Sequence, residues 1–151
     1  MAFDVTATLQ AILSYAQASG YFDSASIGEP VAPPDSLGLH AAVIMRDVGV
    51  TGVYLNGGTR ERHNVTLRIY RNMMDDKQAT ELELAQVVQK VVSDLLGDYD
   101  LGATIREVDA GGMNGPPLSS TWGYVELSHV MFRIVDVQLP LNVDDSATAA
   151  P

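Results

Sequence analysis

The sequence lacks cysteine, has few basic residues and contains no long apolar run. With no cysteine among 151 residues, a disulfide framework and a thiolate metal site are excluded, which fits a protein that folds in a reducing cytoplasm. No segment approaches the roughly 18 apolar residues that a membrane helix needs, and the first ten residues do not resemble a signal peptide. We therefore expect no membrane partner and no secretion by a signal peptide. The 46% of hydrophobic residues is enough for the core of one ordinary domain.

Basic residues are scarce and unevenly placed. The 9 Lys and Arg residues stand against 19 Asp and Glu residues, a formal net charge of −10, which opposes direct contact with nucleic acid phosphates. Arginines gather between residues 46 and 71, whereas acids gather between residues 75 and 109. Two interpretations are open: the charges pair within the monomer, or the unlike patches meet between neighbouring subunits. A head-to-tail contact of the second kind can close into a ring, and its candidate residues are Arg60, Arg62, Arg68, Arg71, Asp75, Asp76, Glu81 and Glu83.

Hydrophobic periodicity predicts the elements of the first half of the chain. A helix is expected from Asp4, a good N-cap, to Ser19, with Gly20 as its stop. The proline-rich segment 29–36 can continue neither a helix nor a central strand, so we expect a loop there. The Asn56-Gly57-Gly58 turn between two strand-like runs predicts a hairpin. Strands are expected over residues 21–27, 39–48, 50–55 and 62–72.

The second half is expected to hold one long helix, a glycine-rich loop and a long strand. A capping box predicts a helix that begins at Thr80, and Gly97 ends its apolar periodicity. Residues 103–109 and 122–139 are expected to be strands, the second of them one long, bulged strand. The segment 110–121, rich in glycine and proline, is expected to be a mobile or extended loop that docks a partner. Its candidate docking residues are Gly111, Gly112, Met113, Asn114 and Gly115.

These elements predict an α+β fold. Strands stand mainly before and after one long helix, which argues against a repeating parallel β-α-β pattern. We expect an antiparallel or mixed sheet with the N-terminal helix and the long helix packed on one face. Residues 1–141 are expected to form a single domain, and the small and acidic residues 142–151 a flexible C-terminal tail.

Residues capable of catalysis or metal binding form no constellation in the sequence. His40, His63 and His129 are scattered, and none has a second ligand at metal spacing. The glycine pairs at 57–58 and 111–112 are followed by no lysine at the spacing of a phosphate loop. The serines lack the strand-to-helix elbow of a hydrolase. We therefore expect no catalytic residue, no metal and no cofactor, and interpret the protein as a non-enzyme.

The order of the elements carries a further signal. A helix over 4–19, a hairpin at 56–58, a strand over 64–72 that leads into a helix over 80–96, and a final strand ending in VDVQLPL at Val135–Leu141 follow one another. In this order and in these lengths the chain resembles a tail terminator, also called a tail completion or neck protein, of a long-tailed, non-contractile bacteriophage. No residue signature accompanies the order, so no individual functional residue is carried over from the family.

The resemblance implies a structural virion protein of the tail neck that is assembled in the host cytoplasm. It implies a hexameric ring that sits on the last ring of the tail tube protein, ends tube polymerisation and faces the head-side connector or stopper protein. DNA would pass through the lumen without specific binding, since an acidic lumen repels phosphate. Two alternatives stay open: another tube or head-side connector subunit, and a small ligand-binding domain or enzyme.

Overall fold

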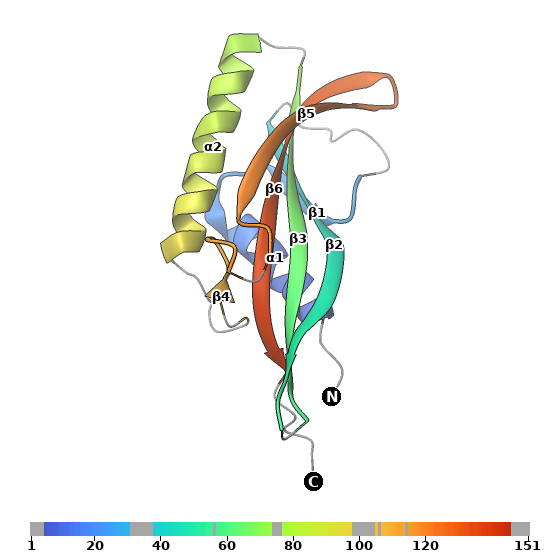
Figure 1. The fold of residues 1–151 in the computed structure, drawn as a ribbon. Coiled ribbons are helices and arrows are strands. Elements are labelled where there is room, and N and C mark those ends of the chain that lie inside the picture. The colour runs from blue at the N-terminus through green and yellow to red at the C-terminus, as the bar shows by residue number, and fades with distance from the viewer. Residues whose placement is uncertain are drawn as a thin grey trace.

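The computed structural model describes residues 5–30, 38–55, 57–73, 77–97, 105, 107–113 and 115–145. This part of the chain has an α+β fold with two helices and a mixed sheet, as the sequence predicts (Figure 1). Neither of its helices combines the length and the apolar content that crossing a bilayer requires. The elements are α1 (Val5–Ser19), β1 (Ser24–Ile27), β2 (Leu39–Val53), β3 (Thr59–Asn72), α2 (Lys77–Gly97), β4 (Glu107–Val108), β5 (Ser119–Leu127) and β6 (Val130–Asp145).

The described strands form one sheet in the order β1-β2-β3-β6-β4, and β5 also pairs with β6. β1 runs parallel to β2, and the other pairs are antiparallel. β5 pairs with the first part of β6, from Val130 to Gln138, and β4 pairs with Leu141 and Asn142 further along. β6 therefore holds two partners in succession along one edge, while β3 lies at the centre of the sheet (Figure 1).

Both helices bury their apolar sides on one face of this sheet. Ile12 and Ala16 of α1 and Leu84, Val91 and Leu95 of α2 are fully buried. The strand residues in the same cluster recur at every second position, as the pleat of a strand requires. This arrangement confirms the predicted packing of the two helices on one face. The strand residues are Val65, Leu67 and Ile69 of β3 and Val135, Val137, Leu139 and Leu141 of β6.

The opposite face, which we call the helix-free face, has a smaller apolar cluster. Ala42, Tyr70, Phe132 and Ile134 are buried there. The rings of Tyr70 and Phe132 meet edge to face, with centroids 6.1 Å apart. The central strand β3 is consequently buried on both faces, unlike a strand with one side open to solvent.

The predicted single strand over 122–139 is wrong, because the structure divides it into the β5–β6 hairpin. Ser128 and His129 form the turn, with φ of 49° and 68°. Two successive residues of positive φ are typical of a type I′ turn, where asparagine and glycine are preferred. A serine-histidine pair within an alternating run therefore gives no turn signal in the sequence.

The long helix begins earlier than predicted. α2 starts at Lys77, so Thr80 lies in its first turn with its side chain buried, and it is not the N-cap. The runs 39–48 and 50–55 are also not separate strands. They form the single strand β2, with register shifts between Met45 and Asp47 and between Val50 and Gly52. A β-bulge absorbs one extra residue without ending the strand, which explains the interrupted pattern.

Strand bounds differ from the prediction near the C-terminus. β6 continues through Asp145, so residues 142–145 belong to the sheet and not to the expected flexible tail. Main-chain pairing with β3 requires no particular side chain, so a small and acidic composition does not prevent it. Residues 146–151 lie outside the described part of the chain. Of the strand expected over 103–109, the described residues form only β4.

Candidate interaction surfaces

The arginines proposed from the sequence as interface residues have acidic partners in the same chain. The arginine–carboxylate distances run from 2.7 to 3.2 Å. Glu81 likewise pairs with Arg133, at 2.5 Å, whereas Asp75 and Asp76 lie outside the described residues. These contacts agree with the interpretation in which the charges pair within the monomer, and contact with a neighbouring subunit stays a prediction. The pairs are Arg60–Asp144, Arg62–Asp109, Arg68–Asp136 and Arg71–Glu83.

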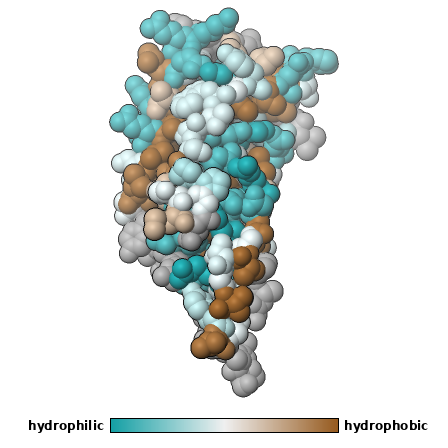
Figure 2. All heavy atoms as spheres, in the orientation of Figure 1, coloured by the Kyte–Doolittle hydropathy of each residue, from teal (hydrophilic) through white to brown (hydrophobic). Residues whose placement is uncertain are grey.

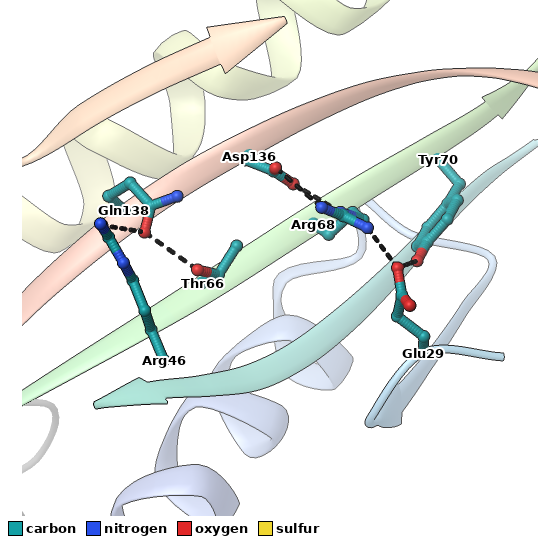
Figure 3. Close-up of polar contacts among 7 residues, drawn as sticks. All are labelled: Glu29, Arg46, Thr66, Arg68, Tyr70, Asp136 and Gln138. Carbon is teal, nitrogen blue, oxygen red and sulfur yellow. Dashed lines mark hydrogen bonds and ion pairs between the residues drawn. The ribbon is translucent and has the colours of Figure 1, made fainter. Parts of the chain in front are cut away.

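Arg68 is the centre of a polar network on the helix-free face (Figure 3). Its guanidinium donates two hydrogen bonds to Asp136, at 2.7 and 3.0 Å, and a third to Glu29. The hydroxyl of Tyr70 donates to the same Glu29 at 3.2 Å. Hydrogen bonding to Asp136 raises the pKa of Arg68, and burial, with a smaller contribution from Glu29, raises the pKa of Tyr70 to about 12. The network ties the segment that follows β1 to the two central strands.

A second group of polar side chains extends the network along the same face. Gln138 of β6 accepts hydrogen bonds from Thr66 at 2.9 Å and from Arg46 at 3.4 Å (Figure 3). A cavity of about 130 Å³ is lined by Arg46 and Gln138 of this group together with Pro116 and Pro117. The group links β2, β3 and β6 across the sheet and fixes their register.

A buried polar cluster lies on the opposite, helix-covered face. Glu61 and His63 of β3 are fully buried, and His63 Nδ1 lies 2.8 Å from the hydroxyl of Thr8 in α1. Glu61 accepts a hydrogen bond from Thr59 and lies 3.6 Å from His63 Nε2. Burial lowers the pKa of His63, although the nearby Glu61 acts in the opposite direction. Because a substrate cannot reach fully buried groups, this cluster connects α1 to β3 and does not form an open site.

The far end of α1 is held to α2 by tyrosines. Tyr15 and Tyr21 donate hydrogen bonds of 2.9 and 2.8 Å to the same oxygen of Asp94. Burial raises the pKa of Tyr15, and the hydrogen bond to Asp94 raises that of Tyr21. An open hollow of about 360 Å³ lies beside Tyr21, Lys90 and Asp94. Within the described residues, no three His, Asp or Glu side chains gather in a way that could hold a metal ion.

Arg62 anchors the loop that the sequence proposes as a docking loop. Its side chain is 5% exposed and donates a 2.8 Å hydrogen bond to Asp109, whose side chain is 4% exposed. It also donates to the carbonyl of Pro116 and, at 3.1 Å, to Asn64. Gly115 lies directly against the guanidinium, since a Cβ there would stand 2.7 Å from its nitrogen. The structure thus brings together Arg62 and Gly115, which the sequence assigns to separate groups.

The sequence predicts a mobile or extended loop over residues 110–121. Its described residues up to 118 fold back through turns and are not extended, residues 119–121 belong to β5, and mobility stays a prediction. The amide of Met113 donates to Asp109 at 2.9 Å, and the amide of Leu118 donates to the carbonyl of Ala110 at 3.2 Å. Gly111 and Gly112 lie in this folded segment, and Gly112 has a φ of 75°. Met113, at the surface of this segment, is 88% exposed to solvent, whereas Asn114 lies outside the described residues. Docking of a partner to this loop stays a prediction.

Two surfaces that the sequence reasoning missed expose large apolar side chains. The first, the tip patch, consists of Val50, Val53 and Leu55 at the β2–β3 hairpin, which are 53%, 73% and 109% exposed. Hydrophobic side chains gather at the narrow end of the molecule in Figure 2, which is the end formed by this hairpin in Figure 1. The sequence contains one sign of this patch: its apolar residues lie beside the Asn-Gly-Gly turn, where polar residues are usual.

The second surface, the aromatic patch, consists of Trp122 and Tyr124 of β5 and Met131 of β6. They are 38%, 59% and 45% exposed. Arg133 stacks on the ring of Tyr124, with 4.4 Å between the guanidinium carbon and the ring centroid, and also pairs with Glu81 of α2. Large apolar side chains that lie together at the surface of a hairpin can mark a contact surface.

Compared with known proteins, the chain matches no protein-family model and no curated protein.

Proposed function

We propose that the protein is a subunit of a ring that caps the tail tube of a long-tailed, non-contractile bacteriophage. The ring ends polymerisation of the tube protein and joins the tail to the head-side connector. The chain acts as a structural virion protein and catalyses no reaction. The hexameric number and the identity of the two partners come from the resemblance of the element order to tail terminators.

The observation that carries the proposal is that the sheet ends in two hairpins with exposed apolar side chains. One contains the tip patch and the other the aromatic patch, and the two point away from each other (Figure 1). A subunit that contacts one neighbour on each side needs two such surfaces, because a head-to-tail interface joins different patches. The element order of the structure also supports the proposal, because it agrees with the order on which the resemblance to tail terminators rests. That order is α1, the β2–β3 hairpin, β3 leading into α2, and the long β6.

The charge of the chain is compatible with passage of DNA through such a ring. A subunit with a net charge of −10 gives the assembly an overall negative field. A negative lumen repels phosphate, so DNA slides through without adhering to the wall.

The test is whether the protein stops tube growth. The purified chain is added to its phage's tube protein during polymerisation, and tube lengths are measured by electron microscopy. We expect shorter tubes with a ring of added density at one end, and light scattering of the protein alone should give a discrete mass. Indefinite self-polymerisation would support the alternative of a tube subunit. Unchanged tube lengths, together with normal head–tail joining in a phage that lacks the protein, would contradict the proposal.

A further inference from the structure

We propose that the tip patch of one chain docks against the aromatic patch of a second copy of the same chain. This inference rests on the proposed function insofar as a ring is built from copies of one subunit. It goes further by naming the two surfaces that meet and the type of contact, which is apolar and not an arginine–carboxylate pairing.

The two patches cannot cover each other within one chain. Trp122 of the aromatic patch pairs with Val135, whereas Thr59, the partner of Val53 beside the tip, pairs with Asp145. The stretch of β6 from Val135 to Asp145 spans roughly 33 Å. The hairpins accordingly lie at opposite ends of the sheet (Figure 1), so neither patch covers the other.

Both patches lie on the same face of the sheet, the one covered by the helices. Val50 and Val53 pair with Glu61 and Thr59, and the register shift between Val50 and Gly52 places both valines on this face. Without the shift, two residues three positions apart would point to opposite faces. The aromatic patch shares the face because its residues alternate with Val125, which packs in the cluster on the helix-free face.

The free edges of the sheet make this contact geometrically simple. Among the described residues, β1 pairs with β2 only as far as Val43, and the outer edge of β2 from Ile44 onward has no strand beside it. β5 likewise has a strand partner on one side only. β2 and β5 run in opposite directions. If β2 of one copy lies beside β5 of the next, and the helix-covered faces of both copies point to the same side, the two strands pair antiparallel and the sheet continues from one copy into the other. With the second copy also displaced along the strands by roughly 33 Å, the distance between the two patches, Val50 and Val53 lie beside Trp122 and Tyr124.

A second copy fits these surfaces because the arginine beside each patch is already paired with a carboxylate of the same chain. Arg60 pairs with Asp144 beside the tip patch, and Arg133 pairs with Glu81 beside the aromatic patch. These arginines therefore do not select an acidic partner, and the half-exposed carboxylate of Glu126, opposite Met131 and 3.6 Å from His129, is an additional charged group at the aromatic patch. One rotation that repeats the same contact covers both patches of every subunit, and a rotation that divides a full turn closes a ring.

The absence of cysteine permits a direct test by cross-linking. Val53→Cys and Tyr124→Cys are introduced into one chain and treated with a short bismaleimide at the highest soluble protein concentration. We expect a covalent ladder on a denaturing gel that ends at the number of subunits in the ring. Mixing the two single variants should give only dimers that contain one copy of each.

The matched control joins Val53→Cys with Gln89→Cys, since Gln89 is exposed on α2 and belongs to neither patch. A ladder as strong in the control, or no ladder in the test pair, would overturn the inference. A chain that stays monomeric at the highest soluble concentration would do the same. In an independent measurement, the double change Val53→Asp and Leu55→Asp should weaken self-association about tenfold or more by light scattering, because it places charges in an apolar contact.

The outcomes separate this inference from the proposed function. A discrete ring without the 53–124 cross-link leaves the terminator proposal standing and rejects these surfaces. The cross-linked ladder together with tubes of unchanged length keeps the self-contact and rejects tube termination.

Discussion

At the scale of single residues, the most informative distinction is between buried and exposed arginines. Arg62 and Arg60 lie two residues apart on β3 and share a face of the strand, yet their surroundings differ. The side chain of Arg62 is enclosed by Asp109 and the loop, whereas that of Arg60 is 29% exposed and pairs with Asp144 at the surface. An exposed pair stabilises a fold little, because water screens it, whereas loss of one member of a buried pair leaves an uncompensated charge.

We predict that Arg62→Met and Arg60→Met have very different effects on the free energy of unfolding. Arg62→Met removes the positive charge that compensates the buried carboxylate of Asp109 and should destabilise the protein by about 3–5 kcal/mol. Arg60→Met, the matched control, should change stability little. Urea unfolding followed by circular dichroism measures both. Equal losses in the two variants would show that the buried pair does not hold the loop.

At the scale of elements, local signals in the sequence were sufficient where a turn or a stop is chemically marked. α1 ends at Ser19 beside Gly20, whose φ of 77° explains the stop, and the Asn-Gly-Gly sequence correctly predicts the β2–β3 hairpin. The β5–β6 turn carries no such residues and was missed. Long-range contacts are also absent from local patterns: Arg62 and Asp109 are 47 positions apart, and no spacing rule relates them.

The unusual turn of the β5–β6 hairpin leads to a prediction about that element. Ser128 and His129 hold positive φ, which asparagine and glycine adopt more readily. The double change Ser128→Asn and His129→Gly should therefore stabilise the protein by about 1 kcal/mol. Thermal unfolding measures the change, with Ser128→Ala and His129→Ala as the control that keeps the positive φ. A melting temperature no higher than that of the unchanged chain would contradict the assigned turn.

At the scale of the whole molecule, the sequence indicated two charge-rich segments, and the structure adds two apolar surfaces. The composition could not reveal these surfaces, because the alternation of Trp122 and Tyr124 is equally compatible with a buried face. Their exposure is a property of the tertiary arrangement, which the local pattern does not contain. The two possible kinds of subunit contact, charged and apolar, differ in how they respond to salt.

The last prediction uses that difference. If arginines and carboxylates of neighbouring subunits held the assembly together, added salt would weaken it by screening. If the tip and aromatic patches hold it, salt should strengthen assembly, because sulfate favours apolar burial and because screening reduces repulsion between subunits of net charge −10. The measurement is the mass by light scattering across a series of sodium chloride and sodium sulfate concentrations, with the Val53→Asp, Leu55→Asp variant as the control that should need about tenfold more protein, or more, to assemble under each condition. We expect the unchanged chain to assemble at lower protein concentration as salt rises, and most readily in sulfate. Dissociation in sodium chloride would instead assign the contact to Arg60, Arg68 and Arg71 and the acids of the next subunit.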